Sequence, residues 1–166
     1  LLSGCWYYGE NTEGKITGGG WFMNLECIDT NYFGGCEEWE ETGDKCTFGF
    51  NAQGLLVGEH EECVTKCNWR GYCWDMCWMV EDWDFKGQFQ FNDHAGTKVH
   101  AEVDGLLSVY KAQWGEDPLV AYEFTGLTKD EMPVEVYIAP DGNSIKIVYD
   151  EDEWQGELSG GNITIH

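Results

Sequence analysis

Two aspartates near the middle of the chain have the spacing of a calcium-binding loop. Asp82 and Asp84 occupy the first and third positions of a DxDxxG pattern whose twelfth position is Asp93. In such loops, oxygen ligands converge on the ion and a glycine permits the sharp turn. Lys86 stands at the fifth position, where an oxygen ligand is needed. We therefore predict either a calcium site at the three aspartates or a plain hairpin turn through residues 85–88.

Two dense acidic clusters, at residues 37–41 and 150–154, have the composition to bind cations or to act on glycosidic bonds. Carboxylate oxygens suit hard cations, and a glycoside hydrolase needs two carboxyl groups held about 5 to 9 Å apart. Neighbours in sequence rarely present that geometry. A solvated loop or turn is therefore the alternative for each cluster.

Nine tryptophans, seven of them before residue 84, supply aromatic faces that can stack on sugar rings. Trp69, Trp74 and Trp78 crowd one short stretch, and a flat apolar ring with an N–H donor suits carbohydrate. We predict these three residues as a carbohydrate-binding platform. The alternative is that they fill the core of the cysteine-rich half.

The sequence shows no machinery for nucleophilic catalysis. Its four histidines lack the spacing of a local zinc site, and no GxSxG nucleophile motif occurs. These patterns favour a protein without enzymatic activity and leave a small secreted glycoside hydrolase as the least favoured function. They require no cofactor, and calcium is optional.

Eight cysteines, an even number, lie in the first half of the chain. A reducing cytosol rarely supports this density without a metal, so we predict four disulfides and a secreted, extracellular protein. The sequence leaves their connectivity open, and a sequon predicts N-glycosylation at Asn162. The cysteines are Cys5, Cys27, Cys36, Cys46, Cys63, Cys67, Cys73 and Cys77.

A formal net charge of −22, from 31 acidic and 9 basic residues, limits the partners of the chain. A polyanion is repelled by nucleic acid and attracts basic partners or cations; solubility in a salty medium is the alternative reason for the charge. The sequence contains no run of about 18 apolar residues, so it predicts no membrane-spanning helix. The start at Leu1 is typical of a processed chain.

The elements of the first half are short strands and one helical segment. Residues 1–58 are punctuated by glycine and predict strands, with a hairpin turn at residues 51–54. Residues 59–80 are predicted as helical, because the CxxxC pairs at 63–67 and 73–77 share a helical face. Either two short helices form a disulfide-linked hairpin, or one bent helix is tied to the other cysteines. The CxxxC…CxxxC spacing resembles that of α-hairpinins, small plant peptides, over these residues alone.

From residue 89 onward, apolar residues recur with period two and predict half-buried strands. We predict a mainly β fold with a disulfide-stapled N-terminal half and one short helical segment, followed by an antiparallel β-sandwich or barrel. The cysteine- and tryptophan-rich region spans 1–83 and the β region 84–166, unless they are one continuous domain. Gly4-Cys5-Trp6 is similar to the glycine-x-tryptophan start of lipocalins, although the cysteine-dense middle departs from their eight regular strands.

Together these features predict a secreted structural or interaction protein, such as a subunit of an extracellular polymeric assembly or matrix. Its acidic faces would bind cations or basic partners, and its partners would be copies of itself or other extracellular proteins. The alternative is an extracellular carbohydrate- or calcium-binding module.

Overall fold

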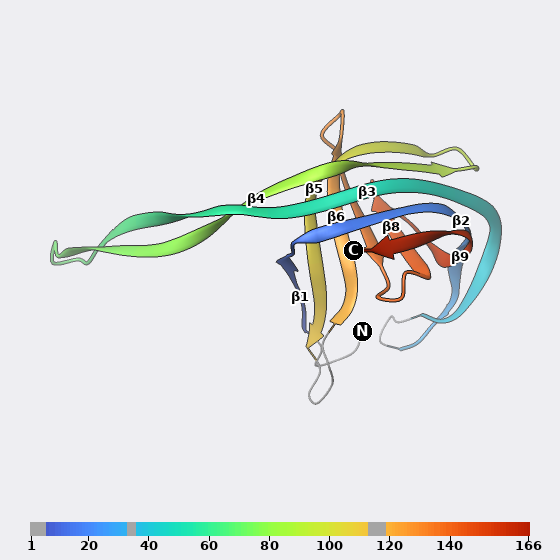
Figure 1. Ribbon diagram of the computed structural model, residues 1–166. Coiled ribbons are helices and arrows are strands. Elements are labelled where there is room, and N and C mark those ends of the chain that lie inside the picture. The colour runs from blue at the N-terminus through green and yellow to red at the C-terminus, as the bar shows by residue number, and fades with distance from the viewer. Residues whose placement is uncertain (1–5, 33–35, 113–118) are drawn as a thin grey trace.

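The computed structural model describes residues 6–32, 36–112 and 119–166, which form nine β-strands (Figure 1). No helix occurs in these ranges, so the prediction of a mainly β chain is confirmed and the helical segment at residues 59–80 is wrong. The strands are β1 Trp6–Asn11, β2 Gly14–Thr30, β3 Cys36–Cys67, β4 Cys73–Asp93, β5 Lys98–Ala112, β6 Leu119–Thr128, β7 Pro133–Ile138, β8 Ser144–Tyr149 and β9 Asp152–Ile165.

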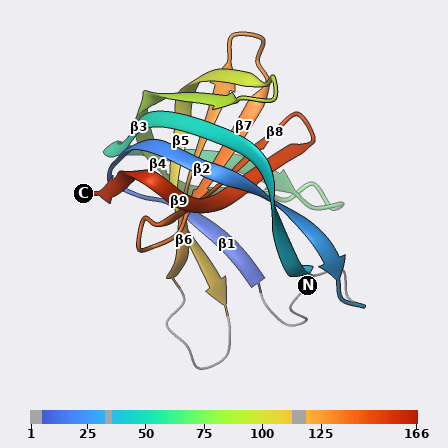
Figure 2. The same cartoon turned by 90° about the vertical axis from the view of Figure 1, so that its right-hand side faces the viewer.

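Eight of these strands close into an antiparallel barrel. Strands β2 to β9 form a meander in which each is hydrogen-bonded to the next, and β9 returns to pair with β2. Figure 2 shows β3, β2 and β9 side by side across the front of this barrel. β1 extends the sheet by pairing with the end of β5 that β4 does not reach. The antiparallel sheet predicted for the second half thus includes strands from the first half, and β4 spans both sides of residue 84.

Phenylalanine side chains from different strands fill the barrel. Phe50, Phe89 and Phe124 are buried, and the ring of Phe124 lies 4.8 Å from that of Phe50 and 5.6 Å from that of Phe89. Side chains alternate between the two faces of a strand, and in an eight-stranded barrel the inward ones fill the interior. This packing is the physical origin of the period-two pattern in the sequence.

One carboxylate lies inside the barrel with its hydrogen bonds satisfied. Asp93 accepts hydrogen bonds from Trp154 Nε1 at 3.1 Å and from the backbone N–H of Ala95 at 3.0 Å. Cys46 lies directly opposite Asp93. Burial, and then the neighbouring Asp93 and Asp44 carboxylates, raise the pKa of the Cys46 thiol to about 12. Burial thus disfavours the thiolate form of Cys46.

The helix prediction is wrong because residues 59–80 form two antiparallel strands with a turn between them. An offset of four places two side chains on one face of a helix and equally on one face of a strand, so the CxxxC spacing fits both. The apolar residues Trp74, Met76 and Trp78 recur with period two, and tryptophan and β-branched residues favour strands.

Two predicted turns, at residues 51–54 and 85–88, are continuous strand and pair with each other in β3 and β4. Gly87 has a positive φ of 141°, and a Cβ at this position would overlap the carbonyl oxygen of Asn51. The side-chain oxygen of Asn51 accepts a hydrogen bond from the backbone N–H of Gln88 at 2.7 Å. Glycine is needed here for close approach of two strands rather than for chain reversal.

A membrane-crossing helix would have to be both long and apolar, and the part of the chain that the structure describes contains none.

Replacing Phe124 with alanine should lower the free energy of unfolding by about 3–5 kcal/mol, because it leaves a cavity among the packed rings. Leu127→Ala lies on the same strand, at a side chain that is 41% exposed, and should change the free energy by about 0.5 kcal/mol or less. Urea denaturation followed by circular dichroism measures both. Equal effects of the two substitutions would contradict the assignment of Phe124 to the barrel interior.

Candidate functional site

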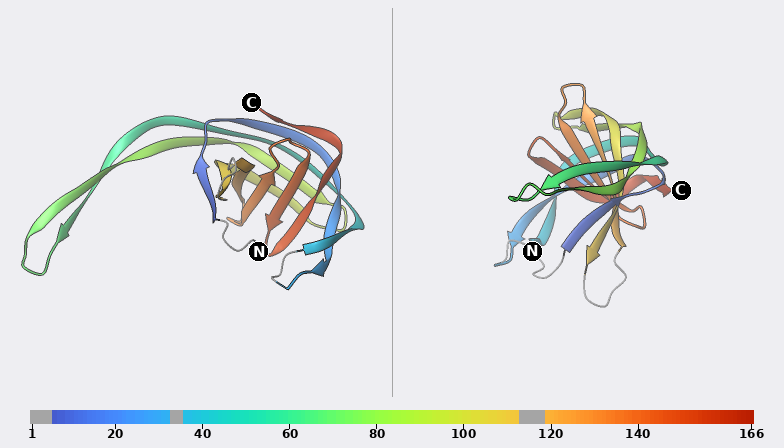
Figure 3. Two further views of the ribbon diagram at one scale, coloured as in Figure 1. Left: turned by 90° about the horizontal axis from the view of Figure 1, so that it is seen from below. Right: turned by 90° about the vertical axis from the view of Figure 1, so that its left-hand side faces the viewer.

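The candidate site is an arm formed by the outer parts of β3 and β4. It comprises residues 55–67 of β3, the turn at residues 68–72 and residues 73–84 of β4, which pair with each other and, within the described chain, with no other strand. Thirteen residues of strand extend about 40 Å. Figures 1 and 3 show the arm leaving the barrel sideways as a curved two-stranded ribbon.

Two disulfides join the strands of the arm near its tip. Cys63 is bonded to Cys77 and Cys67 to Cys73, and each bond links residues directly opposite in the ladder. An isolated two-stranded ribbon is marginally stable in water, and a cross-link removes conformations from its opened state. The two bonds therefore hold the register of an element that no other described strand supports.

A third disulfide, between Cys27 and Cys36, joins β2 and β3 at the opposite end of β3. Three of the predicted disulfides are thus present, and they are typical of an oxidising, extracellular environment. Cys46 forms no disulfide with any other described residue. Cys5 lies outside the described residues, so a fourth bridge stays a prediction.

The side chain of Asn68 organises the turn at the tip. Its Oδ1 accepts hydrogen bonds from the backbone N–H groups of Arg70 and Tyr72 at 3.0 and 3.1 Å. Gly71 has a φ of 81°, a conformation that costs glycine little. Trp69 and Tyr72 are 87% and 71% exposed, and the Arg70 guanidinium lies 4.6 Å from the centre of the Trp69 ring. The turn presents two aromatic rings and one cation to solvent.

One face of the arm carries a row of large apolar side chains. Trp74, Met76 and Trp78 occupy alternate positions of β4, and Val64 lies directly opposite Met76. Between 44% and 48% of each of these four side chains is exposed. The three tryptophans predicted to bind carbohydrate therefore all lie on the arm, in the turn or on this face, rather than in the core.

The other face of the arm carries the disulfides and polar groups. Thr65 donates a hydrogen bond to Asp75 Oδ1 at 2.6 Å, between the two disulfides. Glu61 lies close enough to the sulfurs of Cys63 and Cys77 for the three to hold a metal ion by distance alone. Both sulfurs are committed to the disulfide, and thiolates are the form that binds metal. This face therefore offers no metal centre at that position.

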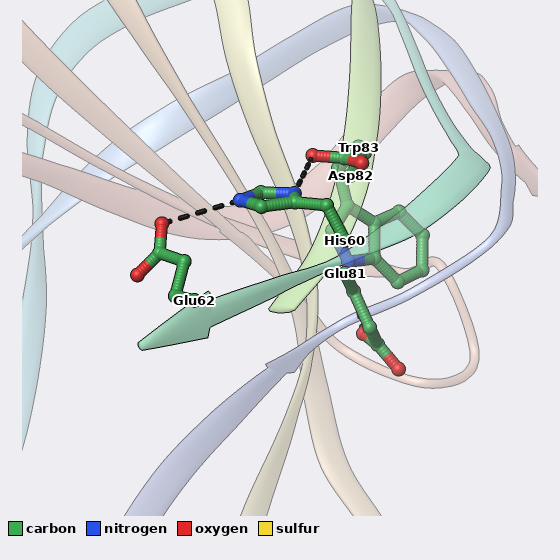
Figure 4. A network of polar contacts seen from close by, with 5 residues as sticks. All are labelled: His60, Glu62, Glu81, Asp82 and Trp83. Carbon is green, nitrogen blue, oxygen red and sulfur yellow. Dashed lines mark hydrogen bonds and ion pairs between the residues drawn. The ribbon is translucent and has the colours of Figure 1, made fainter. Parts of the chain in front are cut away.

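A histidine links the two strands where the arm joins the barrel (Figure 4). His60 Nδ1 lies 2.8 Å from Asp82 Oδ1, across the ladder, and its Nε2 lies 3.2 Å from Glu62 Oε1. Hydrogen bonds to Glu62 and to Asp82, with the charge of Asp82, raise the pKa of His60 above its ordinary value. Protonation of His60 therefore strengthens a link between β3 and β4.

The three aspartates predicted to bind calcium do not lie in a loop. All of them belong to β4, where eleven residues of strand separate Asp82 and Asp93 by about 36 Å. Asp82 contacts His60, Asp84 forms an ion pair with Lys86 at 2.7 Å, and Asp93 lies in the core. The structure brings no two of them onto a shared ligand position, and calcium binding stays a prediction.

The two acidic clusters occupy different strands. Residues 37–41 lie in β3 on the exposed overhang that pairs with β2, and residues 150–154 form the β8–β9 turn and the start of β9. In the second cluster, Glu153 forms an ion pair with Lys146 at 2.7 Å. Asn162, the predicted glycosylation site, is exposed on β9, and its modification stays a prediction.

Sequence reasoning missed Arg70, Tyr72 and Met76 as members of the site. The signal that could have found Met76 is its place in the alternating run from Trp74 to Val80. Arg70 is the only arginine of the chain. The signal that could have found Arg70 is its position beside Trp69 and between two cysteine pairs, which is typical of an exposed turn.

Comparison of the chain with known proteins gives no matching family model, no matching curated protein and no matching solved structure. We therefore infer function from the structure of the arm.

Replacing the four arm cysteines, Cys63, Cys67, Cys73 and Cys77, with serine should accelerate hydrogen exchange of the arm amides about tenfold or more, because the cross-links stabilise a ribbon that is weak alone. The barrel amides should keep their protection. Cys27→Ser/Cys36→Ser is the matched control and should leave the arm amides unchanged. Unaltered arm protection in the quadruple variant would show that the disulfides do not hold the ribbon.

The raised pKa of His60 should appear in its imidazole NMR titration and return to the ordinary range in Glu62→Gln/Asp82→Asn. Because the folded pKa lies above the unfolded one, the link stabilises the arm base fully below the ordinary histidine pKa. Its contribution is lost as the pH rises through the folded pKa. An identical titration in wild type and double variant would contradict the contacts at Glu62 and Asp82.

Proposed function

We propose that this chain is a secreted interaction protein that uses the arm as its docking element, as a subunit of an extracellular assembly or matrix. The observation that carries the proposal is the combination of covalent cross-linking and exposed aromatic side chains on one projecting ribbon. Neither feature is needed to stabilise the barrel, which has its own core.

Exposed apolar area on the arm supports a role in binding. Monomeric soluble proteins rarely leave large apolar side chains clustered in water, and such clusters mark sites of interaction. Tryptophan, tyrosine, methionine and arginine are the residues enriched at protein interfaces. Trp69, Arg70, Tyr72, Trp74 and Met76 belong to these types and follow one another within eight residues of sequence.

The cross-links support binding because they fix the arm before a partner arrives. A flexible ribbon would lose conformational freedom on docking, and a preorganised one loses less. The outer edges of β3 and β4 in the arm pair with no other described strand, so they also offer backbone groups for strand addition. The acidic barrel supports solubility and attracts basic partners or cations.

Carbohydrate binding is a second candidate, favoured by the placement of Trp74 and Trp78. They lie on one face of β4 four residues apart, which corresponds to about 13 Å. Affinity electrophoresis in gels that contain soluble polysaccharides tests this function. It predicts retardation that is lost in Trp74→Ala/Trp78→Ala, and unretarded wild type over a broad polysaccharide panel excludes it for those glycans.

Site-specific photo-cross-linking tests the docking role. Benzoylphenylalanine in place of Tyr72, at the arm tip, should form defined adducts in the native extracellular material of the source, and mass spectrometry identifies their composition. The same group in place of Glu131, which is exposed on the barrel, is the control and should form few. Equal labelling at the two positions, or no adducts at the tip, would contradict the proposal.

A further inference from the structure

The tip of the arm differs in charge from the rest of the molecule. Residues 66–74 contain Lys66 and Arg70 and no acidic residue, so they carry a charge of +2 in a chain of net charge −22. The remaining residues therefore carry −24. Asp75 follows residues 66–74 on β4, where it accepts the hydrogen bond from Thr65. The tip combines these cations with the exposed rings of Trp69, Tyr72 and Trp74. A surface that fits it must offer both an apolar recess and negative charge.

A groove on the barrel offers an apolar recess. It has a volume of about 380 Å³ and lies among β2, β3 and strands β6 to β9. Its apolar lining residues include Leu25, Ala121 and Trp39, which is 45% exposed, whereas Ile138 and Ile145 behind them are buried in the core. Lys146 is the basic residue of the lining, and its Nζ already pairs with Glu153.

Carboxylates surround this groove. Glu157 contributes directly to the lining, and Glu37 and Glu41 are exposed two positions on either side of Trp39. Side chains two apart on a regular strand share a face, so the Glu41 carboxylate lies on the same side of β3 as Trp39. Glu37 lies at a register shift of the β2–β3 ladder, where this alternation is interrupted. This rim is complementary in charge to the arm tip.

Tyr137 connects the groove to two further carboxylates. It lines the groove, donates its hydroxyl hydrogen to Glu135 Oε2 at 3.1 Å and lies directly opposite Glu123 in the β6–β7 ladder. Burial and the charge of Glu135 raise the pKa of Glu123. A cation that arrives beside this pair would relieve the repulsion between the two carboxylates.

The tip and the groove of one molecule are far apart. Trp39 lies near the start of β3 and Cys67 at its end, which corresponds to about 90 Å of strand. In Figures 1 and 3, the start of β3 and the arm tip lie at opposite ends of the molecule. The tip therefore reaches this groove only on another molecule.

We propose that the tip of one copy docks in the groove of a second copy, with Trp69 and Tyr72 against the apolar lining and Lys66 and Arg70 against the carboxylate rim. This inference rests on the proposed docking role of the arm and names its partner. The two contacting surfaces are different, so the contact is heterologous. Every linear oligomer therefore has a free tip at one end and a free groove at the other. Repetition gives a filament, or a ring if the rotation closes.

Complementation between two defective variants tests the proposal. Trp69→Ala/Arg70→Glu removes an aromatic ring and reverses a charge at the tip but leaves the groove unchanged. Trp39→Lys changes the groove but leaves the tip unchanged. Leu127→Lys, exposed elsewhere on the barrel, is the matched control. Size-exclusion chromatography with light scattering measures the mass of the purified chains over a rising concentration series, and thermal melts verify that each variant is folded.

The wild type and Leu127→Lys should grow beyond the monomer mass with concentration, while each defective variant alone stays monomeric. An equimolar mixture of the two defective variants should form a complex of twice the chain mass and nothing larger. Each such pair has one intact tip and one intact groove, and the contact between them uses both. Added salt should weaken it, since the cations and carboxylates are exposed. In wild-type oligomers, a carbodiimide should join Lys66 to a carboxylate of the groove rim in another copy.

A wild type that stays monomeric at every concentration, or a mixture that forms no dimer from folded variants, overturns the proposal. The same holds for oligomers in which Lys66 joins no carboxylate of the groove rim. A tip that cross-links a different protein in native material, while the purified chain stays monomeric, also overturns the second-copy proposal. That last result leaves the docking role of the arm intact, so the two failures are distinguishable.

Discussion

The whole molecule depends on the antiparallel register between β3 and β4. This register runs from Cys46 opposite Asp93, inside the barrel, to Cys67 opposite Cys73 at the arm tip, with one bulge near Leu56. Within the barrel it is supported by neighbouring strands and by the packed phenylalanines. Beyond the barrel those supports end, and disulfides between opposite residues replace them. A single ladder thus joins the hydrophobic core to the exposed arm.

This register also separates the two faces of the arm. Because side chains alternate along a strand, the disulfides and the Thr65–Asp75 hydrogen bond occupy one face, and Trp74, Met76 and Trp78 occupy the other. The cross-links consequently stabilise the ribbon without covering its apolar row. At the tip, Asn68 and Gly71 reverse the chain and leave the neighbouring rings exposed. Stability and exposure come from different residues of the same ribbon.

The barrel and the arm tip carry charges of opposite sign. Most of its surface is acidic, whereas the tip carries two cations and no acid. Repulsion between acidic barrels keeps copies apart at low ionic strength, and contact between a basic tip and an acidic rim is favourable at the same time. The contact that we propose between copies is therefore directional, from the tip of one molecule to the barrel of another.

The strands of the barrel were largely predictable, because the period-two pattern after residue 89 reports which face of each strand is buried. The arm was not, and the reason lies in its cysteines. A spacing of four fits one face of a helix or of a strand, and only the pairing of Cys63 with Cys77 decides between them. The sequence indicates Trp74 and Trp78 as candidates for binding. Their exposure, however, arises because no other described strand pairs with the arm, and no local pattern reports this.

Gly87 illustrates a related limit. The sequence around it resembles a turn or a calcium loop, yet this glycine accommodates the carbonyl of Asn51 from a strand 36 residues earlier. Contacts over such separations in sequence determine whether a glycine reverses the chain or lets two strands approach. The prediction that Asp82, Asp84 and Asp93 converge on one ion requires the chain to reverse direction between them, and β4 continues through these residues as one strand.

The function that we propose requires the arm to be a fixed projection rather than a flexible loop. Electron–electron double resonance between spin labels on unnatural residues at position 72, on the arm tip, and position 131, on the barrel, tests it most directly. We expect one narrow distribution of distances that broadens when the disulfides are reduced. A broad distribution in the oxidised protein, or a short distance from a tip folded back on its own barrel, would contradict it.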